Sequence, residues 1–177
     1  MSDLSNTPRI SIHPVGASDE AAVADVIRAA FGQEAEVRLV HNLRHCGALV
    51  LELLARTDDG RVVGHVAFSR VTGAGAGHRL QISCLAPVSV HPDLQRTGIG
   101  SALIRAGVED LRRLGEDLVL VLGPPAYYPR FGFDAELAKK VQAPYAGAAF
   151  MALALSEAGS RDLPVEVSFA SPFEEFE

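Results

Sequence analysis

The chain has 177 residues, of which 48% are hydrophobic and 21% are charged, a composition typical of a folded globular protein that excludes disorder over most of its length. The 22 acidic and 16 basic residues give a net charge of −6, which excludes a broad nucleic-acid surface, and two cysteines are too few for a disulfide framework. No apolar run approaches the roughly 20 residues of a membrane helix and no export signal begins the chain, so we expect one cytoplasmic domain over residues 1–177, with loose ends at 1–8 and 171–177.

The first third of the chain predicts a short strand, two helices and a hairpin. Residues 10–12 alternate like a strand, and apolar residues then repeat at helical spacing between Ser18 and Phe31. A second helix is expected over residues 34–45. The strand-like runs 48–56 and 61–71 are joined by Asp-Asp-Gly, a strong turn signal, and so predict a hairpin.

The middle of the chain predicts a mobile connection followed by a strand with an interruption. The glycine-rich stretch 72–77 is the expected connection, and residues 80–90 have the pattern of a long strand. Pro87 lies inside that run and cannot donate a hydrogen bond to a neighbouring strand. It therefore predicts a bulge or a break in pairing.

The remaining elements complete an α/β pattern. Residues 101–114 predict an amphipathic helix, and the apolar run 117–122 is typical of a central strand buried on both faces. A short helix through residue 131 and two last strands, 150–155 and 165–169, follow. The order strand, helix, helix, three strands, helix, strand, helix and two strands predicts a mixed central sheet with helices on both faces.

The junction between the strand 80–90 and the next helix is the most informative segment for function. Gly98 and Gly100 allow a sharp turn and a close approach of a ligand to the backbone. The free N–H groups at the start of the helix favour an anion such as a pyrophosphate, although two glycines also suit a plain tight connection. Neither named phosphate motif matches, because Leu103 replaces the third glycine of the dinucleotide motif and the lysine of the P-loop is missing.

Two segments resemble the GNAT superfamily of N-acetyltransferases. The first, Gln95-Arg-Thr-Gly98-Ile-Gly100, is similar to the family's acetyl-CoA loop, Gln/Arg-x-x-Gly-x-Gly/Ala. The second, from Tyr128 to Phe133, is similar to its Tyr-x-x-x-Gly-Phe motif. The resemblance covers about residues 9–170 and implies the GNAT-like acyl-CoA N-acyltransferase fold. It also implies direct transfer of an acetyl group from acetyl-CoA to a primary amine of a small molecule or peptide.

The resemblance also implies where acetyl-CoA binds. In the family, the fourth and fifth strands splay apart and the pantetheine arm pairs with the fourth strand like an added strand. The backbone of Val88, Ser89 and Val90 corresponds to that position. The pyrophosphate would bind the loop and the first turn of the helix, formed by Gln95, Arg96, Thr97, Gly98, Ile99, Gly100 and Ser101.

Tyr128 matches the family's general acid, and its neighbour Tyr127 is the alternative. A third possibility is that both tyrosines only pack against neighbouring side chains. Many members place a glutamate base on the fourth strand, but residues 80–90 contain no acidic residue. The base is therefore unassigned, with four candidates: Glu34, Glu36, Glu52 and His91. Many members also have an asparagine at the end of the fifth strand, where this chain has Gly123 followed by two prolines.

No metal is expected. His41 and His45 share a helical face, but a zinc-protease helix needs glutamate where Asn42 stands. Cys84 could accept the acetyl group in a two-step transfer, but direct transfer is the family's usual route and we expect a buried thiol.

The acceptor amine stays open, since an amino acid, a polyamine, an antibiotic and a protein N-terminus all fit. No nucleic-acid or membrane partner is expected, and because GNAT-like domains often dimerise, a homodimer is one expected assembly. The strand 80–90 lacks the usual acid. A non-catalytic acyl-CoA sensor or interaction module with the same fold is therefore the alternative function.

Overall fold

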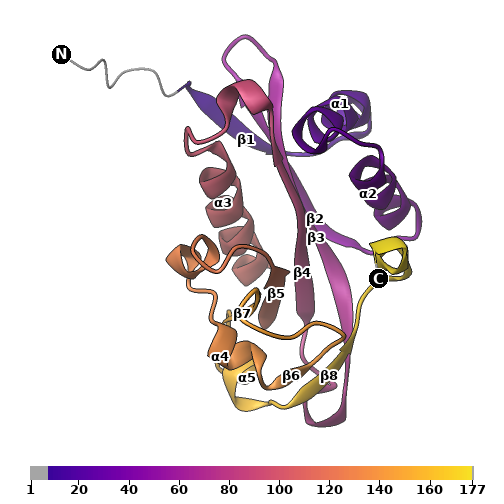
Figure 1. The fold of residues 1–177 in the computed structure, drawn as a ribbon, viewed down its shortest axis with the longest axis vertical. Coiled ribbons are helices and arrows are strands. Elements are labelled where there is room, and N and C mark those ends of the chain that lie inside the picture. Colours follow the sequence, from indigo (N-terminus) through magenta and orange to yellow (C-terminus); the bar gives the residue numbers. More distant parts are fainter. Residues whose placement is uncertain (1–7, 177) are drawn as a thin grey trace, which may run out of the picture.

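A mixed sheet organises the chain in a computed structural model that describes residues 8–176 (Figure 1). Its main path runs β1-β2-β3-β4-β5-β7, and β6 and β8 pair with each other and continue from β3. The strands are β1 (Ile10–Pro14), β2 (Leu49–Thr57), β3 (Val62–Ala74), β4 (Ile82–Val90), β5 (Leu118–Leu122), β6 (Val141–Gln142), β7 (Phe150–Ala154) and β8 (Val165–Ser168). Since β4 and β5 run parallel and β5 and β7 antiparallel, the expected mixed sheet is confirmed.

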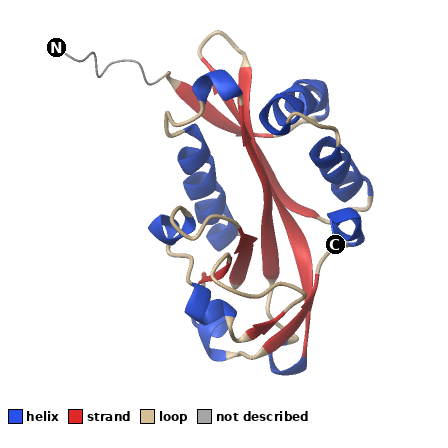
Figure 2. Ribbon diagram, viewed as in Figure 1, coloured by secondary structure: helices blue, strands red, loops and turns tan. Residues whose placement is uncertain are grey.

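Helices lie on both faces of this sheet (Figure 2). α1 (Glu20–Phe31) and α2 (Ala35–His45) cover one face, and α3 (Ile99–Arg113) covers the other. Shorter elements are α4 (Ala135–Ala138), α5 (Glu157–Arg161) and the 3-10 turns η1 (Ala17–Asp19), η2 (Gly75–Gly77), η3 (Pro92–Leu94), η4 (Tyr128–Phe131) and η5 (Ser171–Phe176). In the described part of the chain, no helix is both long and apolar enough to cross a bilayer.

The glycine-rich stretch expected to be a mobile connection is ordered, so that prediction was wrong. β3 continues through Ala74, and Thr72 and Ala74 pair with β8. A Cβ atom on Gly77 would lie 2.6 Å from the Cβ of Val165. These glycines therefore allow close packing between segments. A glycine-rich sequence is expected both for such packing and for a mobile loop, so the sequence alone does not distinguish the two.

The end of the chain also differs from the prediction. Residues 1–7 and 177 lie outside the described residues, but residues 171–176 form η5 rather than a loose tail. Phe173 in this turn is 8% exposed and packs in the same cluster as Leu39 of α2. An ion pair of 2.6 Å between Arg38 and Glu175 also joins α2 to η5. Burial of an aromatic ring thus holds this segment against the body.

The region after β5 is more finely divided than predicted. The expected short helix is the 3-10 turn η4, and β6, α4 and α5 were missed. They contain only two, four and five residues, too few for a hydrophobic period to appear. Local caps define the two helices, because Asp134 accepts the amide of Glu136 and Ser156 accepts the amide of Gly159.

The closest approach of α3 to the sheet that a glycine permits lies in the middle of the helix. Gly107 faces the ring of Phe68 on β3, and a Cβ on Gly107 would lie 2.6 Å from the ring's Cζ. Phe68 is fully buried, so its ring has no free space into which to move. The glycine therefore sets how closely α3 approaches the strands that form the site.

Replacing Gly107 with alanine should destabilise the protein. The gain in helix propensity is about 1 kcal/mol, but the clash with Phe68 costs more, and we expect a net loss of about 1–2 kcal/mol in the free energy of unfolding. Denaturant titration measures this loss. The double variant Gly107→Ala with Phe68→Leu should recover part of it, and a stability equal to or above wild type in the single variant would contradict the packing argument.

Candidate functional site

β4 and β5 part in the middle of the sheet. Their parallel pairing ends at Cys84 and Leu120, so the rest of β4 has no partner on that side. On its other side, Val88 pairs with Val66 and Leu85 pairs with Phe68. Three steps along β4 therefore oppose two along β3, which is a β-bulge at the position of Pro87. The predicted interruption is confirmed, and it frees one edge of β4.

A cavity of about 440 Å³ occupies the place where the strands part. Residues of β4 and β5 form its walls within the sheet. Tyr128 reaches it from the layer of α3, and Leu39 and Phe173 line it from the layer of α2. The cavity thus takes its lining from both faces of the sheet, and groups bound from opposite faces can meet in it.

The backbone where α3 begins offers donors without acceptors. The first hydrogen bond of the helix runs from the amide of Ala102 to the carbonyl of Gly98, at 3.0 Å. Within residues 8–176, the amides of residues 96–101 donate to no acceptor. Arg96 and Gly98 have φ angles of 64° and 92°, and such turns direct successive N–H groups to one side. This arrangement suits a diphosphate.

Two of the predicted binding side chains shape the loop itself. The Gln95 side chain donates to the carbonyl of Val90 at 3.1 Å, and the Thr97 hydroxyl donates to the carbonyl of Leu94. Arg96 is exposed, so its guanidinium is available to an anion. The loop is therefore anchored to β4 by its own side chains, and its amides face outward.

The predicted strand residues lie at the free edge of β4. Val88 lines the cavity, and its neighbour Ser89 is buried with its hydroxyl unpartnered among the described residues. The carbonyl of Val90 accepts a hydrogen bond from the Gln95 side chain. The loop, the first turn of α3 and this edge are thus contiguous.

Tyr128 is buried, with 6% of its surface exposed, and its ring lies edge-on to Phe133 at 5.7 Å between centroids. Burial raises the pKa of its phenol to about 12, with smaller contributions from Tyr127 and Cys84. The phenol therefore stays protonated at neutral pH, which suits a proton donor.

Gly123 explains how Tyr128 fits. A Cβ on residue 123 would overlap the edge of the Tyr128 ring, so a larger residue there would displace the ring. The structure gives a physical reason for glycine at this position.

Tyr127 has a different environment. Its hydroxyl hydrogen-bonds to the Ser101 hydroxyl at 2.9 Å, and the guanidinium of Arg130 lies 4.5 Å from its ring centroid. It does not line the cavity. Its contacts connect the turn η4 to the start of α3, so the structure separates the two tyrosines that the sequence offered as alternatives.

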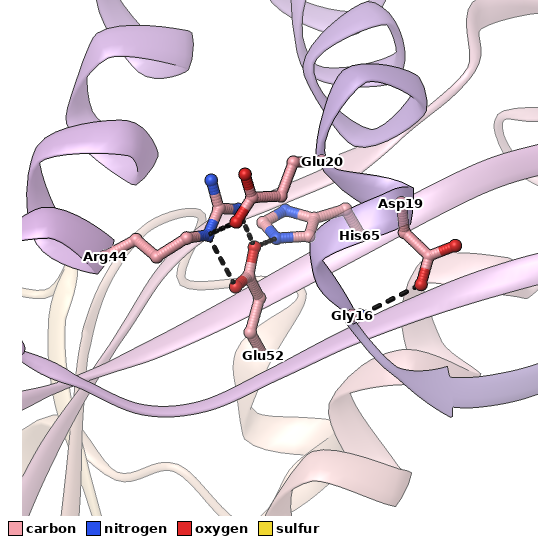
Figure 3. A network of polar contacts seen from close by, with 6 residues as sticks. All are labelled: Gly16, Asp19, Glu20, Arg44, Glu52 and His65. Atoms are coloured by element: carbon pink, nitrogen blue, oxygen red, sulfur yellow. Dashed lines mark hydrogen bonds and ion pairs between the residues drawn. The ribbon is translucent and has the colours of Figure 1, made fainter.

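Glu52, one of the base candidates, belongs to a polar network between β2, β3 and the two helices above them (Figure 3). It accepts from His65 at 2.8 Å and from Arg44 at 2.6 Å, and Arg44 also approaches Glu20 at 3.4 Å. Burial is the largest single influence and raises the pKa of Glu52, but the hydrogen bonds and charges of His65 and Arg44 together leave the pKa below its ordinary value. The carboxylate is thus engaged, away from the cavity lining.

Among the four base candidates, Glu36 is the one that lines the cavity. Glu34 pairs with Arg28, whose hydrogen bond lowers the pKa of this exposed carboxyl. His91 caps η3 by accepting the amide of Asp93 at 3.2 Å. Sequence reasoning had no means of ranking these residues, because the cavity is assembled from distant segments.

Cys84 lies at the point where β4 and β5 part and also lines the cavity. It is 7% exposed, and burial raises the pKa of its thiol to about 12. A thiol that stays protonated is a poor nucleophile, in agreement with the expected direct transfer. No cluster of three or more metal-ligating side chains occurs among residues 8–176.

Comparison with known proteins points to one family. Residues 11–135 match the family model of the acetyltransferase (GNAT) domain. Among curated proteins, the uncharacterized N-acetyltransferase YhbS of Escherichia coli (strain K12) is 39% identical over 116 residues, which cover 66% of this chain and 68% of that protein.

Solved structures give the same result. The structure of E. coli YhbS, a GNAT family N-acetyltransferase in complex with CoA, has a TM-score of 0.87 and 30% identity, covering 99% of this chain and 97% of that one. A GNAT family acetyltransferase from Brucella melitensis in complex with acetyl-CoA has a TM-score of 0.76 and 35% identity, covering 93% of this chain and 98% of that one.

The raised pKa of Tyr128 can be measured in the free protein. Because its phenol ionises only near a pKa of about 12, the phenolate absorbance that develops up to pH 10.0, the ordinary value, should be equal in wild type and Tyr128→Phe. Ultraviolet difference titration measures this. A transition at or below pH 10.0 that disappears in the variant would contradict the buried position.

Proposed function

The chain belongs to the GNAT family of N-acetyltransferases, and from that premise we propose that it transfers the acetyl group of acetyl-CoA directly to the primary amine of a small molecule or peptide. The observation that supports this most strongly is the run of unpaired amides at residues 96–101, next to the free edge of β4 and the cavity. Two similar structures were solved in complex with CoA and acetyl-CoA.

Binding of acetyl-CoA uses backbone more than side chains in this proposal. The amides of residues 96–101 hold the pyrophosphate, with the helix dipole of α3 behind them and Arg96 beside them. The pantetheine arm pairs along Val88 to Val90, as an added strand would. The thioester then reaches the cavity in which Tyr128 lies.

The transfer needs one proton donor and one proton acceptor. The neutral amine attacks the thioester carbonyl, a C–N bond forms, and the C–S bond breaks as the thiolate leaves. Tyr128 gives its proton to the thiolate, and the proton lost by the amine nitrogen returns to the phenolate. The acceptor's ammonium has already released one proton, so one proton is set free overall for each acetyl group transferred.

We also propose that the protein acts in the cytoplasm. Cys46 and Cys84 are free thiols, and Cys46 is exposed. Free thiols persist in a reducing environment, which supports the cytoplasm as the place of action. A secreted chain with the same two thiols would be open to oxidation at Cys46.

Gly100→Glu should abolish CoA binding, because it puts bulk and negative charge where the pyrophosphate is held. Gly100→Ala is the matched control: its methyl would lie 3.5 Å from Val90 and 3.6 Å from Tyr127, which are ordinary contact distances. Calorimetric titration with CoA should find no binding to the first variant and near wild-type affinity for the second. Unchanged affinity of Gly100→Glu would count against the loop as the binding site.

Tyr128→Phe should lower kcat by about 100-fold while CoA affinity stays unchanged, since one proton transfer typically contributes that much or more. Release of free thiol from acetyl-CoA in the presence of amine measures turnover. Tyr127→Phe is the control, because Tyr127 bonds to Ser101 and lies outside the cavity lining, and it should keep most of the turnover. Full turnover by Tyr128→Phe with CoA still bound would remove the assignment.

A panel of amines and peptides distinguishes an enzyme from a sensor. Incubation with acetyl-CoA should release free thiol in an acceptor-dependent manner. A protein that binds acetyl-CoA and releases none with any member of the panel would be an acyl-CoA sensor instead.

A further inference from the structure

The part of the cavity beyond the thioester position has an aromatic wall. Its members come from four separate segments: the end of α1, the stretch before β7, the start of β7, and the end of the chain from β8 to η5. They are Phe31, Tyr145, Phe150, Phe169, Phe173 and Phe176. Ring contacts link four of these residues, with centroids 6.3 Å apart for Tyr145 and Phe150, 5.4 Å for Tyr145 and Phe169, and 6.2 Å for Phe169 and Phe173.

The lining of this cavity also includes most of the large hydrophobic side chains that are left open to solvent. Four of these stand out among the described residues, and three of them line the cavity: Phe31 (41% exposed), Leu122 (52%) and Phe176 (40%). The fourth, Leu114, lies outside it. Exposed apolar side chains gathered around one cavity are typical of a binding site for an apolar group.

One carboxylate faces this apolar surface. Glu36 is the charged residue among the cavity's described lining, and it is half-buried. Its oxygens accept from the side-chain amide of Gln33 at 2.9 and 3.1 Å. Arg38 lies close enough to interact electrostatically with Glu36, but its ion pair is with Glu175, and Arg28 pairs with Glu34. Glu36 therefore keeps its charge available to a cation that enters the cavity.

This combination discriminates between the acceptors that the sequence left open. A polyamine or an aminoglycoside brings several charged or polar groups, and an apolar wall would leave most of them without partners at a considerable cost. The single carboxylate of Glu36 can pair with one ammonium group of an acceptor, but not with several. The aromatic faces can bind an apolar body, and they also attract a neighbouring cation.

We propose that the acceptor is a primary amine on an aromatic or other large apolar body, with the ammonium bound by Glu36 and the body bound by the aromatic wall. This inference rests on the proposed function, because it identifies the acceptor of that transfer. The main competing occupant is a long acyl chain on CoA. Such a chain would leave the Glu36 carboxylate next to hydrocarbon, an unfavourable arrangement that an amine avoids.

The test uses wild-type protein with acetyl-CoA and three primary amines: 2-phenylethylamine, ethanolamine and 1,4-diaminobutane. Burial of the phenyl ring should give 2-phenylethylamine a kcat/KM higher than that of either polar amine by at least about tenfold. A parallel assay compares octanoyl-CoA with acetyl-CoA. Calorimetric titration of 2-phenylethylamine into the CoA-bound protein measures binding independently of turnover.

Three variants locate the effect. Phe31→Ser and Phe176→Ser remove exposed rings of the wall, and each should raise the KM for 2-phenylethylamine by about fivefold to tenfold at unchanged CoA affinity. Glu36→Gln should raise the same KM by about tenfold, since it removes the charge and keeps the shape. Leu114→Ser is the matched control, because Leu114 is the exposed hydrophobic residue outside the cavity, and its kinetics should equal wild type.

The outcomes separate this inference from the proposed function. Turnover without preference for the apolar amine, KM values that do not respond to the variants, or a preference for octanoyl-CoA would overturn the acceptor class and leave the transferase intact. Binding of 2-phenylethylamine to the CoA-bound protein, weakened by Phe176→Ser and without transfer, would support the acceptor site and overturn the transferase. If 2-phenylethylamine is neither bound nor acetylated, the proposed acceptor class is wrong.

Discussion

The parting of β4 and β5 is the constraint on which the site depends. The pairing of β4 with β5 ends at Cys84 and Leu120, and the pairing of β4 with β3 has a bulge at Pro87. A sheet normally pairs its interior strand edges, so an unpaired edge in its middle exposes backbone groups to a ligand. The same separation makes room for a cavity. α3 begins where β4 ends, which places its unpaired amides beside that edge.

The sequence predicts those parts of the fold and site in which local chemistry decides the structure. Pro87 removes a backbone donor, and Gly98 permits a positive φ, so both effects can be derived from residue type and position. The glycines in residues 72–77 led to a wrong prediction, because close packing against Val165 and free motion both favour glycine. The elements β6, α4 and α5 were missed because capping and pairing with distant segments define them, rather than a period of their own.

The lining of the cavity could not be predicted in this way. Phe31, Glu36, Phe150 and Phe173 lie in segments far apart along the chain, and each has an ordinary local pattern. Only the fold brings them to one cavity. The same holds for the choice between Glu36 and Glu52, because their partners differ. Glu52 is held by His65 and Arg44, and Glu36 accepts from Gln33 and lines the cavity. Departures from the family pattern find a physical basis here as well, because the glycine at position 123 accommodates the ring of Tyr128.

The cavity takes its lining from both layers that flank the sheet, and this has a kinetic consequence. If the cosubstrate and the amine approach from opposite sides, neither obstructs the path of the other. Both can then be present together before any bond changes, and the two products can depart through separate exits. Steady-state velocity plots for such a scheme would give intersecting rather than parallel lines, because no acetylated enzyme is formed in it. The buried Cys84 thiol, whose pKa is raised to about 12, is a poor nucleophile for the alternative two-step route.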